Sequence, residues 1–281
     1  MGKHILVTGA NGYIGRHVTT ALCDAGAEVT AVDLQTTGVD PRARGLTYDI
    51  FNGSAEIYQE LGSPDVCLHM AWKDGFVHNS HAHMELLSKH YSFIHRMMDG
   101  GLTQLAVMGT MHEIGYYEGA IDETTPCNPT SMYGIAKDAL RRSTFLLAKE
   151  KNVCVQWLRA YYIYGDDKYS NSIFAKVLQA AERGDDRFPF TTGTNQYDFI
   201  HVDRLSEQIA ACVMQTRVSG VINCCTGQPM TLAEKVERFI QEHGLSVRLD
   251  YGAFPDRPYD SPGVWGDAAK ITDIITHRDE I

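Results

Sequence analysis

The sequence lacks the features of a membrane, secreted or nucleic-acid-binding protein. Its 281 residues contain no run of about 18 apolar residues, the length that a membrane-spanning helix requires. The first residues lead directly into a strand-like segment and do not resemble a signal peptide. Lysine and arginine form no cluster, and the formal net charge of −10 argues against nucleic acid or an anionic membrane as a partner. We therefore expect a cytoplasmic protein that holds anionic ligands by local devices such as helix N-termini.

The sequence also lacks the cysteine pattern of a metal or redox site. Its 7 cysteines are an odd number, and none forms a C-x-x-C pair, so we expect reduced residues of the core. No internal repeat, low-complexity tract or linker rich in proline, glycine or serine divides the chain. With 44% hydrophobic residues, the chain can bury one substantial core and a small second lobe.

Short apolar runs alternate with amphipathic stretches in the first half of the chain. Because helices and strands differ in their apolar period, these patterns predict an α/β fold with a Rossmann, doubly wound parallel sheet. The predicted strands are 4–8, 28–33, 46–50, 66–71, 104–110 and 153–158. The predicted helices are 13–25, 80–99, 131–150, 172–183 and 231–242.

A glycine-rich segment joins the first predicted strand to the first predicted helix. Glycine at such a turn permits a tight bend, a close approach to a pyrophosphate and packing of helix on strand, while the helix N-terminus supplies partial positive charge. The position of the segment therefore predicts a dinucleotide site. The expected contacts are Gly9, Asn11, Gly12, Tyr13, Ile14 and Gly15.

Asp33 ends the second predicted strand. A carboxylate there accepts hydrogen bonds from the ribose hydroxyls of NAD and repels the 2′-phosphate of NADP, so NAD(H) is the expected cofactor; a turn cap is the alternative role. Arg16, Arg42 and Arg44 keep NADP(H) open as the second choice. Asp49, after the third strand, either bonds the adenine amino group or is an exposed turn residue.

Tyr133 and Lys137 form a candidate catalytic pair. They lie one turn apart on the same face of the helix over 131–150. A tyrosine, with an ordinary pKa near 10, acts at neutral pH when a cation stabilises its phenolate. Thr110, at the end of the fifth strand, is placed to bond the same substrate oxygen. A second Y-x-x-x-K copy begins at Tyr164, but it runs into a Gly-Asp-Asp turn that need not bring its side chains together.

Together these motifs resemble the extended short-chain dehydrogenase/reductase family of nucleotide-sugar epimerases, dehydratases and reductases. Further matches are His69-Met70-Ala71 and the segments 158–165, 197–203 and 220–227. The resemblance implies that Thr110, Tyr133 and Lys137 are the catalytic triad. It adds further cofactor contacts, which are Asp49, Ile50, Met70, Ala71, Trp72, Tyr133 and Lys137.

Departures from the family pattern narrow the expected reaction. Dehydratases of the family carry an Asp-Glu pair directly after the catalytic threonine, where this chain has Met111 and His112. We therefore expect a reductase of a nucleotide-linked 4-keto-6-deoxy sugar, with hydride transfer at C4 and Tyr133 as the acid/base. A nucleotide-sugar epimerase and a non-catalytic NAD(H)-binding regulatory protein are the alternatives. Trp72 replaces a small residue of the family and predicts a bulkier wall beside the nicotinamide.

The resemblance places the nucleotide sugar against a smaller lobe. Arg257 matches the family arginine that grips the diphosphate, whereas a surface ion pair is its alternative role. Asn171 and Phe188 lie where the family frames the nucleotide and sugar, although core packing explains the phenylalanine equally well. The expected substrate contacts are Trp72, Thr110, Met111, His112, Asn171, Phe188 and Arg257.

The expected domains are an NAD(P)-binding Rossmann domain and a small substrate-binding lobe. The first covers 1–165 with about 200–220, and the second covers 166–199 and 221–281. Dimerisation through two helices is common in the family, so we expect a homodimer. No metal is expected, because the histidine-rich segment 78–83 lacks accompanying ligands at suitable spacing and is typical of a solvated loop or a helix start.

Overall fold

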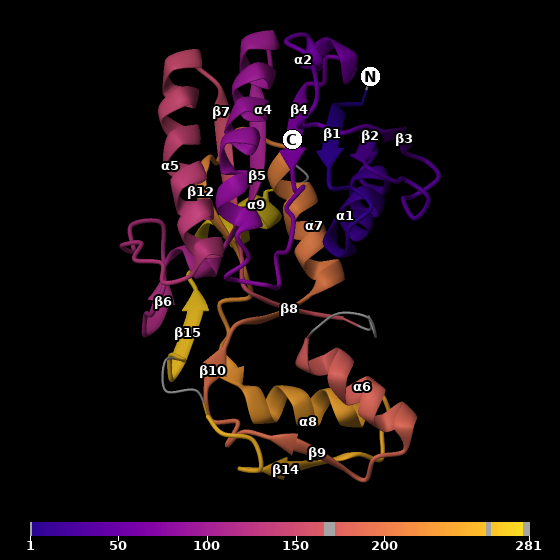
Figure 1. The fold of residues 1–281 in the computed structure, drawn as a ribbon, viewed down its shortest axis with the longest axis vertical. Helices are drawn as coiled ribbons and strands as arrows, with labels where there is room; N and C mark the ends of the chain where they lie inside the picture. Colours follow the sequence, from indigo (N-terminus) through magenta and orange to yellow (C-terminus); the bar gives the residue numbers. More distant parts are fainter. Residues whose placement is uncertain (1, 166–171, 257–259, 278–281) are drawn as a thin grey trace.

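A parallel sheet forms the larger part of the molecule. The computed structural model describes residues 2–165, 172–256 and 260–277. The strands of this sheet are β1 (His4–Thr8), β2 (Glu28–Asp33), β3 (Arg44–Thr47), β4 (Val66–His69), β5 (Gln104–Thr110), β7 (Cys154–Ala160) and β12 (Gly220–Cys224). They lie in the order β12-β7-β5-β4-β1-β2-β3, and every neighbouring pair is parallel (Figure 1). The order in which successive strands are added to the sheet reverses between β1 and β4, and folds of this kind bind ligands at that point. The predicted Rossmann fold is confirmed.

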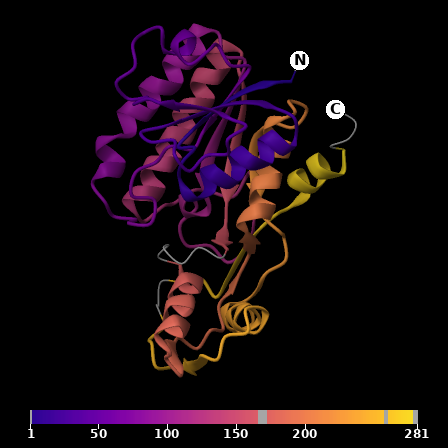
Figure 2. The ribbon, with the colours of Figure 1, turned by 90° about the vertical axis from the view of Figure 1, so that its right-hand side faces the viewer.

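Helices cover both faces of this sheet (Figures 1 and 2). One face carries α1 (Tyr13–Asp24), α7 (Val202–Val213) and α9 (Ala269–Thr276). The other carries α2 (Ile57–Glu60), α4 (Leu87–Gly100) and α5 (Met132–Lys151). Successive strand residues point to opposite faces, so Val7 joins the first core and Leu6 the second.

A smaller lobe lies beyond the carboxyl ends of the strands, below the sheet in Figure 1. Its core contains Phe174, Phe190 and Phe239. Its helices are α6 (Ile173–Arg183) and α8 (Leu232–Glu242). Its strand pairs include β9 (Arg187–Phe190) with β14 (Arg248–Tyr251) and β8 (Tyr162–Tyr164) with β11 (Phe199–His201). A further sheet has the order β13 (Met230–Thr231), β10 (Gln196–Tyr197), β15 (Gly263–Gly266) and β6 (Gly119–Ile121).

Two predicted elements differ from those observed. The predicted helix over 80–99 is two helices, α3 (Ala82–Glu85) and α4, because the backbone of Leu86 (φ −93°, ψ −8°) interrupts the helical geometry. The strand predicted at 46–50 ends at Thr47, because the Asp49 side chain accepts a hydrogen bond from Phe51 N and turns the chain.

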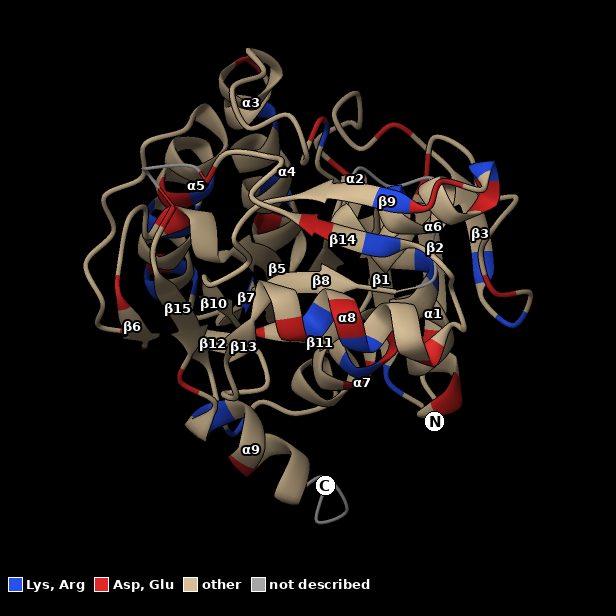
Figure 3. Cartoon of the chain, turned by 90° about the horizontal axis from the view of Figure 1, so that it is seen from below, with Lys and Arg blue, Asp and Glu red and all other residues tan. Residues whose placement is uncertain are grey.

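The observed packing also bears on the predicted domains. β12 lies in the large sheet, and α9 packs against α7 and β12, so these two elements belong spatially with the sheet and not with the lobe. All 7 cysteines are free. Among the described residues, no helix is long and apolar enough to cross a membrane. Residues of both charges are interspersed on α8 and β14 at the far end of the lobe, and β9 carries the positive residue Arg187 (Figure 3).

Candidate active site

The loop between β1 and α1 fits a dinucleotide. Gly9 has a φ of +69°, and a Cβ there would lie 2.7 Å from Ala71 Cα, so the position requires glycine. A Cβ on Gly15 would collide with the Gly9 carbonyl oxygen. Gly12 is exposed and precedes α1, and no described side chain caps this helix N-terminus. Uncapped N–H groups, with no acidic residue in the first turn, suit a pyrophosphate.

Asp33 lies beside this loop at the carboxyl end of β2. Its Oδ2 accepts a hydrogen bond from Asn11 N at 2.9 Å, and its Oδ1 accepts one from Leu34 N at 2.7 Å. Asn11 Oδ1 accepts from Gly38 N at 3.0 Å, which ties the loop after β2 to the glycine-rich loop. The half-buried carboxylate is thus fixed by backbone donors and keeps lone pairs for a ribose.

Two predicted cofactor residues follow β3. Asp49 is exposed, and its oxygens accept from Phe51 N at 3.0 Å and from Asn52 Nδ2 at 2.7 Å. These bonds agree with its alternative role as a turn residue, and a contact with adenine stays a prediction. Ile50 is buried in the core beneath α2 and α4.

The predicted catalytic side chains meet at the carboxyl end of β5. The Ser131 side chain caps α5, so the helix begins just before Tyr133. One turn later, Lys137 Nζ donates to the Met108 carbonyl oxygen of β5 at 2.7 Å. The Thr110 hydroxyl lies close enough to the Tyr133 phenol to lower its pKa. The structure therefore brings Thr110, Tyr133 and Lys137 together.

Burial controls the ionisation of this group. It raises the pKa of Tyr133 to about 12, although the Thr110 hydroxyl acts in the opposite direction. It lowers the pKa of Lys137, an effect that the Glu113 carboxylate partly offsets. Lys137 Nζ lies 6.0 Å from the centre of the Tyr133 ring and 3.8 Å from that of the Trp72 ring. The pKa of Tyr133 is thus raised and not lowered as expected, because burial and the Glu113 carboxylate both act in that direction, and the phenol is protonated at neutral pH.

Trp72 lies directly beside Lys137. Its Nε1 donates to His83 Nδ1 at 3.0 Å, and its ring stacks on that of His90 with 4.3 Å between centroids. Because His83 Nδ1 accepts, its Nε2 carries the hydrogen and donates to the Val77 carbonyl oxygen at 3.0 Å. The histidine-rich segment leads into the start of α3, one of its two expected settings, and His83 of that helix is buried where it orients Trp72.

Two further imidazoles lie against Tyr133, namely the predicted substrate contact His112 and His78, which extends the site beyond the predicted residues. The His78 ring is nearly parallel to the Tyr133 ring at 5.5 Å, and it lies 4.3 Å from the His112 ring. The His78 carbonyl oxygen accepts from Tyr133 N at 2.9 Å. Burial lowers the pKa of His112 to about 4, so this imidazole is neutral at pH 7. The sequence signal for His78 is its place in the loop after β4, at the ligand-binding edge of the sheet.

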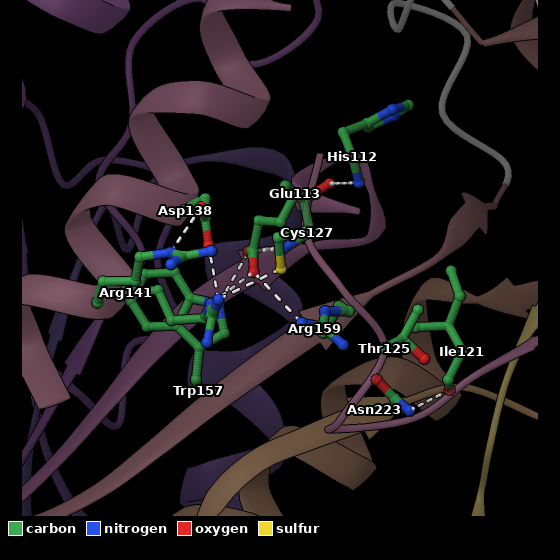
Figure 4. Close-up of polar contacts among 12 residues, drawn as sticks. His112, Glu113, Ile121, Thr125, Cys127, Asp138, Arg141, Trp157, Arg159 and Asn223 are labelled. Atoms are coloured by element: carbon green, nitrogen blue, oxygen red, sulfur yellow. Dashed lines mark hydrogen bonds and ion pairs between the residues drawn. The ribbon is translucent and has the colours of Figure 1, made fainter. Parts of the chain in front are cut away.

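A buried carboxylate, Glu113, lies next to Thr110 and is absent from the predicted site. Figure 4 shows it among Arg141, Trp157 and Arg159. Its Oε1 accepts from Thr110 N and from Trp157 Nε1, each at 2.8 Å. Arg141 of α5 and Arg159 of β7 approach its other oxygen. The spacing Thr-x-x-Glu is that of a capping box, which is the sequence signal that identifies it.

The predicted substrate side is described in part. Met111 is buried in the core of the smaller lobe, and Phe188 packs against that core, in agreement with its alternative role. On the cofactor side, the predicted contacts Met70 and Ala71 follow β4, and their backbone N–H groups both donate to Thr8 Oγ1, at 3.2 and 3.3 Å. Two predicted contacts, Asn171 and Arg257, lie outside the described residues.

The second Y-x-x-x-K copy has different surroundings. Tyr164 ends β8, and its ring contacts those of Phe174 and His201. Lys235 Nζ from α8 lies 3.6 Å above the Tyr164 ring. The lysine of this copy, Lys168, lies outside the described residues. Tyr164 is thus a tyrosine of the smaller lobe and provides a matched control for Tyr133.

A family model described as the NAD dependent epimerase/dehydratase family matches residues 5–225. The chain belongs to this family. The match spans the glycine-rich loop, Asp33 and the group formed by Thr110, Tyr133 and Lys137. The predicted membership of the extended short-chain dehydrogenase/reductases is confirmed.

Known proteins of this family resemble the chain over nearly its whole length. dTDP-6-deoxy-L-talose 4-dehydrogenase (NAD(+)) of Aggregatibacter actinomycetemcomitans is 43% identical over 268 residues, covering 94% of this chain and 99% of the relative. UDP-N-acetylglucosamine 4-epimerase from Methanobrevibacter ruminantium superposes with a TM-score of 0.84 at 18% identity, over 97% and 92% of the two chains. UDP-glucose 4-epimerase from Thermotoga maritima gives a TM-score of 0.80 at 22% identity, over 96% and 91%. The two epimerases show the fold, and the dehydrogenase is similar in sequence as well.

Proposed function

We propose that this protein is an NAD(H)-dependent oxidoreductase that interconverts a dTDP-linked 6-deoxyhexose and its 4-keto form. The observation that carries this proposal is the 43% sequence identity, over nearly all of both chains, to a 4-dehydrogenase of dTDP-6-deoxy-L-talose. It agrees with the reductase predicted from the sequence. The absence of an Asp-Glu pair after Thr110 also separates the chain from the dehydratases of the family.

In the direction of reduction, bound NADH supplies the hydride that is added to C4. Tyr133 donates its proton to the C4 oxygen, because burial keeps the phenol protonated at neutral pH. The Thr110 hydroxyl orients the same oxygen. Lys137, within 6.0 Å of the tyrosine ring centre, stabilises the phenolate that remains. Oxidation reverses these steps, with the phenolate accepting the proton of the C4 hydroxyl.

The fixed Asp33 carboxylate supports NAD over NADP. It accepts two backbone hydrogen bonds next to the glycine-rich loop, and a 2′-phosphate there would meet its negative charge. Arg42 is engaged elsewhere, at 2.7 Å from both Asp24 Oδ1 and Asp40 Oδ2. The charges of the described residues thus favour a dinucleotide without the extra phosphate.

The proposal includes a homodimer and a cytoplasmic location. Large apolar side chains on the adjacent helices α4 and α5 are exposed, namely Tyr91, Ile135 and Leu146. A second copy covering them by helix packing would remove this apolar surface from water. Light scattering coupled to size exclusion tests the dimer: the mass of two chains supports it, and the mass of one chain contradicts it.

An absorbance assay at the NADH band tests the reaction. The 4-keto sugar formed by oxidising dTDP-6-deoxy-L-talose at C4 should be reduced with consumption of one NADH per sugar. A panel of UDP-linked sugars serves as the comparison and should be poorer substrates. Interconversion of two sugars without net consumption of NADH, by protein that retains stoichiometric nicotinamide, would instead show an epimerase.

A further inference from the structure

The Glu113 carboxylate controls the backbone of Thr110 from behind. The two residues form a capping box, in which Glu113 Oε1 accepts from Thr110 N at 2.8 Å and Thr110 Oγ1 accepts from His112 N at 3.3 Å. A threonine hydroxyl has one hydrogen to donate and two lone pairs. Because one lone pair is used by the backbone, the hydroxyl is held in one orientation, in which it is close enough to the Tyr133 phenol to lower its pKa.

The surroundings of Glu113 are built around its charge. The side chain is 0% exposed, and burying a carboxylate is costly unless it is paired. Trp157 Nε1 donates to Oε1 at 2.8 Å. A Cβ at Gly109 would collide with Trp157 Nε1 and lie 2.9 Å from Glu113 Oε1, so glycine leaves the space that both groups occupy.

The second oxygen of Glu113 faces two arginines. Oε2 lies 3.5 Å from Arg141 Nε and 3.6 Å from Arg159 Nη2, and it forms no hydrogen bond with any described residue (Figure 4). Arg141 bonds Asp138 at 2.6 Å, and Arg159 donates to the Asp122 carbonyl oxygen at 3.1 Å. The cluster therefore joins α5 and β7 to the end of β5 by charge, with one acceptor atom incompletely satisfied. Replacing such a cluster by apolar residues is often neutral for stability, so the cluster is weak evidence for a purely structural role.

We propose that Glu113 is a positioning residue for the reaction described above, which fixes the backbone of Thr110 so that the threonine hydroxyl faces the Tyr133 phenol. The inference rests on the proposed function. It has a second, electrostatic consequence, because the same carboxylate raises the pKa of Lys137 against the effect of burial. The ammonium that stabilises the phenolate thus depends on Glu113.

Other titratable and charged groups also face Glu113. In the described part of the chain these are Tyr133, Lys137 and Arg141 from α5, Arg159 from β7, and Cys127 and Tyr161 from the adjoining loops. His69 of β4 and His90 of α4 face Lys137, and burial lowers the pKa of both imidazoles, so they are neutral where Lys137 titrates. The two arginines stay charged at any pH at which the protein is folded. With rising pH, the lowered pKa of Lys137 makes it the first group of the catalytic triad to lose its proton.

Glu113→Gln tests the electrostatic part of the proposal, because it keeps an acceptor oxygen for Thr110 N and removes the negative charge. We expect kcat for reduction of the dTDP-linked 4-keto sugar to fall about tenfold to a hundredfold, with KM values for sugar and NADH unchanged. The alkaline limb of kcat should move to lower pH, because Lys137 loses its anionic neighbour. Glu113→Asp keeps the charge but is too short for the capping bond, so kcat should fall without that shift of the limb.

A direct titration gives a readout apart from activity. In protein labelled with ¹³C at lysine Cε, the Lys137 resonance, assigned with Lys137→Met, should titrate at lower pH in Glu113→Gln than in the wild type. Gln156→Met is the control for a merely destabilised fold, because this buried side chain lies near the amino end of β7, where it bonds Gln104 and backbone carbonyl oxygens. It should lower the melting temperature and leave both kcat and the Lys137 titration unchanged.

The outcomes separate this inference from the proposed function. With an active wild type, unchanged kcat, pH limb and lysine titration in Glu113→Gln would overturn the electrostatic role, and full kcat in Glu113→Asp, which loses the capping bond, would overturn the positioning role. If Glu113→Gln does not fold, Glu113→Asp and the titration of Lys137 in the wild type decide: full kcat in the aspartate variant, or a wild-type Lys137 that loses its proton below pH 6, contradicts the proposal. A wild type that does not reduce the sugar would overturn the proposed function and leave the lysine titration as the test of the electrostatic role.

Discussion

The two ends of strands β5 and β7 carry buried polar clusters of opposite character. At the amino end, Gln104 Nε2 donates to Gln156 Oε1 at 3.0 Å, and both amides also donate to backbone carbonyl oxygens. Lys3 Nζ completes this cluster by donating to Gln104 Oε1 at 2.9 Å. At the carboxyl end, Glu113 and its arginines are charged, and atoms of all three lack hydrogen-bond partners among the described residues.

The contrast separates stability from function within one pair of strands. Thr110 lies six residues beyond Gln104 on β5, or about 20 Å at the rise of a strand, and Arg159 lies three residues beyond Gln156 on β7, or about 10 Å. The amide cluster is fully satisfied, and such networks stabilise a unique core. The charged cluster adjoins Tyr133 and Lys137, where perturbed ionisation serves catalysis. Variants at the two ends should therefore fail in different assays.

The largest effect is expected at the carboxyl end, for Tyr133→Phe. This change keeps the ring packed against Trp72 and His78 but removes the proton that the C4 oxygen receives. General acid catalysis typically contributes about 10²–10⁴-fold, so kcat should fall by that order while NADH binding and melting temperature stay unchanged. Steady-state kinetics and fluorescence titration with NADH measure both quantities. Tyr164→Phe is the matched control and should keep its turnover. If Tyr133→Phe kept its turnover and Tyr164→Phe lost it, Tyr164 and not Tyr133 would be the proton donor.

Asp33→Ala tests the same edge of the sheet at the cofactor. Loss of a charge-assisted bond to the ribose is worth roughly 1.5–3 kcal/mol, so the preference for NADH over NADPH in kcat/KM should shrink about tenfold to a hundredfold. Kinetics with the two cofactors in parallel measure this ratio. Equal use of NADH and NADPH by the wild type would contradict the role of Asp33. Arg16 and Arg44 would then be the candidates for binding the 2′-phosphate of NADPH.

At the amino end, Gln156→Met should reduce stability without affecting catalysis. It removes the bond from Gln104 Nε2 to Gln156 Oε1 and those from Gln156 Nε2 to three backbone carbonyl oxygens, although each of these partners keeps another hydrogen bond. Each lost bond costs about 0.5–1.5 kcal/mol net. Urea unfolding should therefore show a lower free energy of unfolding by at least that amount, with kcat unchanged where the protein is folded. A parallel loss of kcat would show that the two ends are coupled.

The smallest effect is expected for Lys3→Met at the edge of the amide cluster. Lys3 is half-buried, so water can replace its ammonium at Gln104 Oε1. The free energy of unfolding should fall by about 0.5–1.5 kcal/mol, the net value of one hydrogen bond. Urea unfolding of Lys3→Met beside Gln156→Met provides the comparison. If Lys3→Met lowered the free energy of unfolding as much as Gln156→Met does, the amide cluster would depend on Lys3 and not mainly on its own amide groups.

Sequence patterns predict the parts of this molecule whose causes are local. The loop from Gly9 to Gly15 and the pair Tyr133 and Lys137 are each defined within a few residues, because a tight turn or one helical turn determines their geometry. Glu113 is different: its arginines and Trp157 come from α5 and β7 and meet it only in the folded chain. The sequence around it shows only the capping box, which does not indicate a charged cluster.

The histidine-rich segment shows the same limit. Its composition is typical of a solvated loop or a helix start, yet His83 is buried against Trp72 and His78 lies on Tyr133. Those contacts depend on the hydrogen bond from Tyr133 N to the His78 carbonyl oxygen, which joins segments that are distant along the chain. Tertiary contacts of this kind leave no periodic signal.

Transfer of deuterium from NADH to the sugar tests the proposed reaction most directly. NADH deuterated at the transferred position of C4 is incubated with the wild-type protein and the dTDP-linked 4-keto-6-deoxyhexose, and the product is analysed by mass spectrometry and proton NMR. The proposed function predicts one deuterium, bound to C4 of the sugar, for each NADH oxidised, and about 10²–10⁴-fold slower labelling in Tyr133→Phe. An unlabelled product, formed without oxidation of NADH, would contradict it.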